Sequence, residues 1–154
     1  LPAPNRVIGG IAAFGLGHVA YIFGLVRYTS NSGYTEPAAF IIALGVWWGA
    51  ALIFWYRIVY RTGERTVMHI LALPYALLLA GTAGVATGLG LQADAFMPVG
   101  IGAGLFLFSD LILAAQIFND MYFPLIGDTV WLLYGPGQML IVYGALLPSL
   151  LGGV

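Results

Sequence analysis

Five stretches of about 20 mostly apolar residues follow one another along the chain, and they constrain its fold more than any other feature. Each stretch is long enough to cross the hydrocarbon core of a bilayer as an α-helix, which pairs every backbone N–H and C=O within itself. We therefore predict an all-α, polytopic transmembrane helix bundle that forms a single domain over residues 1–154. The predicted spans are Val7–Arg27, Ala38–Tyr56, Val67–Leu91, Ala95–Phe118 and Thr129–Leu151.

The scarcity of charge supports this interpretation and excludes several classes of function. Only 7% of the residues are charged and the mean hydropathy is +0.97, whereas about 25% of a soluble domain is charged. With five arginines, no lysine and a net charge of -1, the chain has no basic face for a nucleic acid. The absence of cysteine excludes thiol catalysis, and the absence of lysine excludes a Schiff base to retinal or pyridoxal phosphate. No cofactor is predicted.

The arginines predict an orientation in the membrane. Only Arg27 lies at one side, whereas the other side carries Arg6, Arg57, Arg61 and Arg65. By the positive-inside rule, the N-terminal flank and the loop between the second and third spans are predicted to be cytoplasmic. The small size favours the cytoplasmic membrane of a bacterium or archaeon. Because the chain begins with Leu-Pro-Ala-Pro rather than Met, we expect further residues before it, which could add further helices.

Small residues recur at intervals of four in two of the spans. They are Ala80, Gly84 and Gly88 in the third span, and Gly100 and Gly104 in the fourth. Such stripes let two helices approach closely inside a membrane, so we predict helix packing at these positions. The glycines of the fourth span do not indicate a phosphate-binding loop, because they lie in an apolar span and no lysine follows them.

Two ionisable side chains lie clearly at membrane depth, where such groups are costly and indicate function by default. Asp110 lies near the middle of the fourth span and His18 near the middle of the first, at nearly the same depth. Either side chain could instead be a structural hydrogen-bonded link between helices. Among the polar residues at span ends, Asp120 and Asp128 are the strongest candidates for more than capping or solvation.

Other polar side chains can share this layer of the bundle. Tyr21 follows His18 by three residues, Ser109 precedes Asp110, and Tyr134 and Gln138 are spaced i,i+4 around a Gly-Pro-Gly interruption. Because that interruption frees backbone groups, its helix face is expected to point into the protein. The sequence thus predicts one polar cluster of His18, Tyr21, Ser109, Asp110, Tyr134 and Gln138. No metal site is predicted, since a catalytic zinc usually needs three protein ligands and only two histidines are present.

Three blocks of sequence resemble, in order and spacing, the YhhN family of integral membrane proteins, the lysoplasmalogenases. They are Phe14–Tyr21, Gly102–Asp110 and Tyr134–Ile141. The resemblance extends over essentially the whole chain. Members of that family typically have eight helices, and their N-terminal part, with a further Gly-Asp pair, has no counterpart here. The resemblance therefore agrees with the expectation that N-terminal residues are missing.

The resemblance implies hydrolysis of the vinyl ether bond of lysoplasmalogens to a fatty aldehyde and a glycerophospho-choline or -ethanolamine. Asp110 is expected to be the general acid, because lipid disfavours a charged carboxylate and leaves the proton in place. His18 is expected to orient or deprotonate the water. The residues expected to contact the lysophospholipid are Tyr21, Ser109, Tyr134 and Gln138.

Three other classes of function remain open at this point. A small transporter or lipid-binding protein could use Asp110 and His18 as a proton relay, although no convincing internal repeat supports transport. A metal-dependent lipid amidase would need more histidines than the chain has. A purely structural membrane subunit would need none of these polar groups. The expected partners are the lipid bilayer and a lysophospholipid, and the oligomeric state is open.

Overall fold

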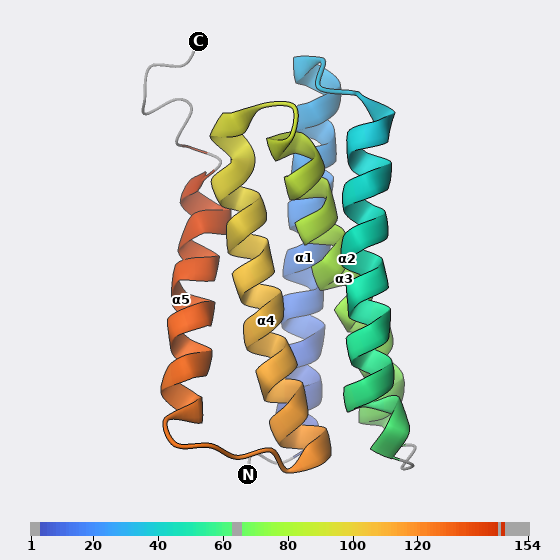
Figure 1. The fold of residues 1–154 in the computed structure, drawn as a ribbon, viewed down its shortest axis with the longest axis vertical. Coiled ribbons are helices and arrows are strands. Elements are labelled where there is room, and N and C mark those ends of the chain that lie inside the picture. The colour runs from blue at the N-terminus through green and yellow to red at the C-terminus, as the bar shows by residue number, and fades with distance from the viewer. Residues whose placement is uncertain (1–3, 63–65, 145, 147–154) are drawn as a thin grey trace.

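A computed structural model describes residues 4–62, 66–144 and 146 of the chain. It forms a bundle of five long α-helices in which successive helices run in opposite directions (Figure 1). Two short 3-10 helices, η1 and η2, precede α3 and α4, respectively. The bounds are α1 Pro4–Ser32, α2 Pro37–Ile58, η1 Tyr60–Thr62, α3 Val67–Gly90, η2 Asp94–Phe96, α4 Met97–Asn119 and α5 Ile126–Gly144.

The predicted all-α membrane bundle is confirmed. Four helices, α1 to α4, are long and apolar enough to span a membrane. The fifth, α5, is helical over 19 described residues and is not among those four. The predicted end of this span, residues 145–151, lies outside the described residues apart from Leu146.

The first helix extends past its predicted end at Arg27 and stops at Ser32. Gly33 then adopts a positive φ of 78°, the left-handed conformation that commonly terminates a helix. The next helix begins at once, because Pro37 occupies the first turn of α2 and Glu36 caps it by accepting from the N–H of Ala38. The residues of the connection, Gly33 to Pro37, therefore determine where α1 ends and where α2 begins.

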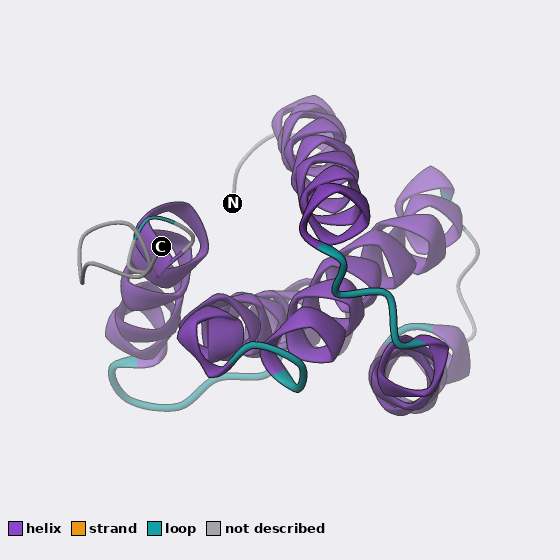
Figure 2. Ribbon diagram, turned by 90° about the horizontal axis from the view of Figure 1, so that it is seen from above, coloured by secondary structure: helices purple, strands orange, loops and turns teal. Residues whose placement is uncertain are grey.

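The third helix lies in the middle of the bundle and packs against α1, α2 and α4 (Figure 2). Its C-terminal half, Leu79–Gly90, is buried on every side except at Thr87. Beyond it, α5 packs against the opposite side of α4 (Figure 2). Many large apolar side chains of the helices remain exposed, as expected for surfaces that contact lipid.

The predicted role of the small residues in packing is confirmed. A Cβ on Gly84 would lie 3.0 Å from the Cα of Leu44, and one on Gly88 would lie 3.0 Å from the Cα of Phe40, so α2 and α3 are nearly in backbone contact. In α4, a Cβ on Gly104 would lie 2.8 Å from the Trp47 ring. The fourth and fifth helices meet at Gly102, where a Cβ would lie 2.7 Å from the carbonyl oxygen of Gly137.

Candidate functional site

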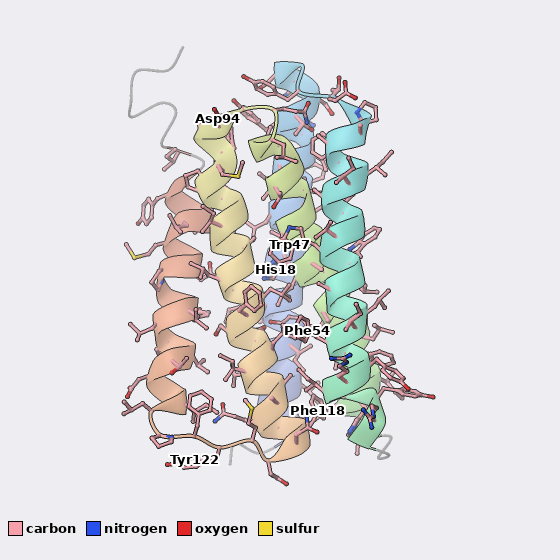
Figure 3. All side chains as sticks on the ribbon, viewed as in Figure 1. His18, Trp47, Phe54, Asp94, Phe118 and Tyr122 are labelled. Carbon is pink, nitrogen blue, oxygen red and sulfur yellow. The ribbon has the colours of Figure 1, made fainter. Side chains whose placement is uncertain are left out.

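A cavity of about 810 Å³ lies among α1, α2, α3 and α4, in the half of the bundle where α2 and α4 end. Its walls are mainly apolar, and they include Phe54 and Phe118, which Figure 3 shows in that half. The polar groups on its walls belong to Trp55, Tyr75, Asp110, Gln116 and Asp120. The hydrogen bond from Asn119 Nδ2 to the carbonyl oxygen of Ile58, 2.9 Å long, ties α4 to α2 at this end.

Asp110 lies on the wall at the deep end of this cavity. It is nine residues from the end of α4 at Asn119, which corresponds to about 14 Å along the helix axis and thus to roughly the middle of a bilayer. The hydroxyl of Tyr75 in α3 donates a hydrogen bond of 2.5 Å to Asp110 Oδ2. Within the described part of the chain, Tyr75 is the one hydrogen-bond partner found for this carboxyl group. The other oxygen is therefore available to a molecule in the cavity.

His18 lies away from the cavity, in the packed middle of the bundle (Figure 3). It is 1% exposed, and its Nδ1 lies 2.9 Å from Thr82 Oγ1 in α3. The Thr82 hydroxyl also lies 3.2 Å from the carbonyl oxygen of Leu78. The second ring nitrogen of His18, Nε2, has no hydrogen-bond partner among the described residues.

Aromatic rings connect His18 to the fourth and fifth helices. The rings of His18 and Phe106 have centroids 4.9 Å apart, and Phe106 lies 5.4 Å from the ring of Tyr134. The ring of Tyr21 lies 5.9 Å from that of His18, and its hydroxyl donates to Gln138 Oε1 at 3.3 Å. Tyr134 and Gln138 thus face inward, as predicted from the interruption in their helix.

The structure brings four of the six predicted site residues into one group and leaves two outside it. His18, Tyr21, Tyr134 and Gln138 form a group around Phe106. Asp110 instead pairs with Tyr75, and the hydroxyl of Ser109 donates to the carbonyl oxygen of Val130 in α5 at 3.2 Å. The expectation of one joint polar cluster was therefore wrong. Its physical reason is the rotation of α4, which directs Asp110 towards α3 and the cavity.

Sequence reasoning missed Tyr75 and Thr82, the partners of the two ionisable groups. They are seven residues apart on one face of α3, which separates their levels by about 10.5 Å. A hydroxyl group within an apolar span was the available signal, because such a group must find a partner in lipid. Phe106, which joins the aromatic rings, gave no signal that distinguishes it from the other apolar residues of α4.

The charged residues at the cavity end of the bundle lie mostly outside the cavity. Arg57 and Arg61 are exposed and do not line its wall. Across the described residues, no group of three His, Cys, Asp or Glu side chains is close enough to hold a metal ion. The site therefore offers acid-base chemistry by the buried carboxyl group of Asp110, which Tyr75 holds on the wall of a mainly apolar cavity.

These features define a polytopic helical membrane protein with a carboxyl group in an intramembrane cavity. The family model described as YhhN family matches residues 1–145, and the chain belongs to this family. Neither the characterised proteins nor the solved structures compared with it gave a match.

Proposed function

We propose that this protein hydrolyses the vinyl ether bond of lysoplasmalogens. Water and the alkenyl ether give a fatty aldehyde and a glycerophospho-choline or -ethanolamine, with no other reactant. The observation that carries the proposal is the Asp110 carboxyl group, held by Tyr75 on the wall of a mainly apolar cavity in a bundle of the YhhN family. The expectation from sequence that Asp110 is the acid is the core of this proposal.

The size and lining of the cavity suit a single-chain lipid. Its volume of about 810 Å³ lies within the range of roughly 300–1,000 Å³ typical of ligand sites. A second, almost wholly apolar groove of about 680 Å³ shares Phe54, Ile58 and Leu111 with it. Such a surface can hold an alkenyl chain while the ether bond stays beside Asp110. The apolar linings of the cavity and of this groove also limit the water that reaches the reacting carbon.

The reaction needs one proton to be delivered and one to be returned. Asp110 donates a proton to the β-carbon of the vinyl ether, which becomes an oxocarbenium ion. Tyr75 remains hydrogen-bonded to Oδ2 and stabilises the carboxylate that results. A water molecule adds to the cation and loses its extra proton to Asp110, so the carboxyl group is restored. The hemiacetal then breaks into aldehyde and alcohol.

The proton-relay alternative receives less support from the geometry. A relay requires neighbouring groups to be connected by hydrogen bonds. In the described residues, His18 pairs with Thr82 and Asp110 pairs with Tyr75, and these two pairs are about 10.5 Å apart along α3. A role for His18 in positioning water also remains a prediction, because His18 does not line the cavity.

The direct test compares two substrates that differ in one bond. Purified protein is incubated with a lysoplasmalogen and with its saturated ether analogue, and free aldehyde is measured by mass spectrometry. We expect aldehyde from the vinyl ether only, and we expect the same rate after treatment with a metal chelator. A folded protein that releases no aldehyde from the vinyl ether would overturn the proposal. A rate lost to the chelator and restored by metal would overturn the acid-base mechanism.

A further inference from the structure

The cavity has a second carboxyl group at its other end. Asp120 is exposed and lines the cavity where α4 finishes. It is the C-cap of that helix, with φ 48° and ψ 31°, and its backbone N–H donates to the carbonyl oxygen of Ala115. The cavity thus runs from the buried Asp110, deep in the bundle, to Asp120 at its mouth.

Aspartate tolerates the left-handed conformation of this position, but its charge is unfavourable at a helix C-terminus. The left-handed conformation at a helix end is usually taken by glycine, and sometimes by asparagine. The C-terminus of a helix also carries partial negative charge, which disfavours a carboxylate and attracts a cation. The carboxyl group of Asp120 therefore adds negative charge where the backbone already supplies it, and both act on the same cavity mouth.

The described side chains on the cavity wall carry negative charge. Among them are two acids, Asp110 and Asp120, and no arginine, lysine or histidine. Two aromatic residues, Trp55 and Phe118, also line the half that holds Asp120. Aromatic rings bind ammonium groups, including quaternary ones, and a carboxylate on the same cavity wall supplies the opposite charge. Arg57 and Arg61, the arginines at this end whose side chains are described, do not line this wall.

We propose that the mouth of the cavity binds the ammonium group of a zwitterionic lysophospholipid, with Asp120 as its counter-ion. This inference rests on the proposed function, because it places the ether bond at Asp110. The two aspartates are ten residues apart on α4, about 15 Å along the axis. Nine bonds join the ether oxygen to the ammonium nitrogen and span about 11 Å. The remaining distance of about 4 Å is that of one ion-pair contact.

The side chain of Gln116, which lies between the two aspartates on the cavity wall, suits the phosphate of the same lipid. Gln116 lines the cavity six residues from Asp110, about 9 Å along the axis. Five bonds join the ether oxygen to phosphorus and span about 6 Å, which leaves about 3 Å for a hydrogen bond from the amide. Trp55 also lines this part, and its buried Nε1 has no acceptor within the described ranges. The polar groups of the wall thus follow the order of the polar groups in the lipid.

The test measures binding of saturated ether lysolipids, which the proposed reaction does not cleave. Protein in neutral detergent is titrated with analogues bearing ethanolamine, choline or glycerol on the phosphate, with tryptophan fluorescence as the signal. We expect the two amine-bearing lipids to bind about fivefold to tenfold more tightly than the glycerol one. In Asp120→Asn this preference should fall to about onefold, while binding of the glycerol lipid stays within about twofold.

The variant and its control separate binding from folding. Asparagine adopts the left-handed conformation readily, so Asp120→Asn is expected to keep the helix end and the melting temperature. Asp128→Asn is the matched control, because Asp128 is an exposed acid in the first turn of α5 and does not line the cavity. It should keep the full preference for amine-bearing lipids.

The outcomes distinguish this inference from the proposed hydrolysis. Amine preference that depends on Asp120, without aldehyde release from any vinyl ether, would support the ammonium site and overturn the hydrolase. Aldehyde release from a protein that binds all three lipids equally would support the hydrolase and overturn the ammonium site. Persistence of the preference in Asp120→Asn, or its loss in Asp128→Asn, would overturn the assignment to Asp120. Binding of none of the three lipids would also overturn it.

Discussion

The two halves of α3 differ in what surrounds them. The half from Leu79 to Gly90 is buried among helices that approach at glycines, down to near backbone contact. The half from Val67 to Leu78 has no fully buried residue and contributes Met68, Ala72, Tyr75 and Ala76 to the cavity wall. One continuous helix therefore supplies both the close-packed part of the bundle and one wall of the cavity that holds Asp110.

This difference shows how a small membrane bundle can hold a site without a separate domain. Close packing at one end fixes the distances between helices, because glycine contacts leave no room for sliding. Large side chains at the other end keep the same helices apart, and the space between them stays open. Each half can be changed by substitutions that leave the other half untouched, and the following predictions use that property.

The largest effect is expected in the open half. Asp110→Asn removes the proton donor while keeping the shape of the side chain, so aldehyde release should fall by about 10²–10⁴-fold. The thermal unfolding temperature should change little, because Asp110 faces the cavity and Asn can still accept from Tyr75. Turnover near the wild-type rate would show that Asp110 is structural.

The packed half should respond in stability rather than in chemistry. Gly102→Ala places a Cβ 2.7 Å from the carbonyl oxygen of Gly137 and 2.9 Å from the N of Ile141. Because both are backbone atoms, α5 must shift, at a cost of about 1–3 kcal/mol in the free energy of unfolding.

The matched control is Gly45→Ala in α2, where a Cβ meets nothing within 4 Å. It should keep or raise stability, since alanine favours a helix by up to about 1 kcal/mol over glycine. Unfolding in denaturant measures both variants. Equal stability of the two variants would contradict the close approach of α4 and α5.

Tyr75→Phe tests the support of the carboxyl group. It removes the hydrogen bond of 2.5 Å to Asp110 Oδ2 and leaves the ring in place. Aldehyde release should fall about tenfold in kcat with little change in KM, which corresponds to about 1.4 kcal/mol. Tyr143→Phe, on an exposed face of α5, is the control and should keep the wild-type rate. A change confined to KM would indicate that Tyr75 contacts substrate instead.

The smallest effect concerns two tryptophans of α2. The Nε1 of Trp48 donates to the carbonyl oxygen of Leu77 at 3.2 Å, whereas that of Trp55 has no acceptor in the described part of the chain. Trp48→Phe should cost about 1 kcal/mol of stability, and Trp55→Phe close to none. Melting temperatures measured side by side in the same detergent test the pair. A larger loss in Trp55→Phe would reveal a partner for its N–H.

Much of the fold could be predicted from sequence because lipid leaves few solutions. The helical spans and the glycine contacts at Gly84 and Gly104 follow from length, residue size and hydropathy. The expectation that His18 and Asp110 lie at nearly the same depth does not hold, because their partners in α3 are about 10.5 Å apart along the helix axis. The rotation of each helix about its axis does not follow, since lipid and protein interior are equally apolar. For that reason the partners of Asp110 and His18, which are Tyr75 and Thr82, emerged only from the structure.

The first helix differs from the others in how it is held. A Cβ on Gly9, Gly10, Gly17 or Gly24 would meet nothing within 4 Å, so these glycines of α1 make no close approach to a neighbour. Side-chain hydrogen bonds join it to α3 at Thr82 and to α5 at Gln138. Each such bond is worth about 1 kcal/mol in a membrane. We therefore expect α1 to be the wall of the cavity that separates most readily from its neighbours.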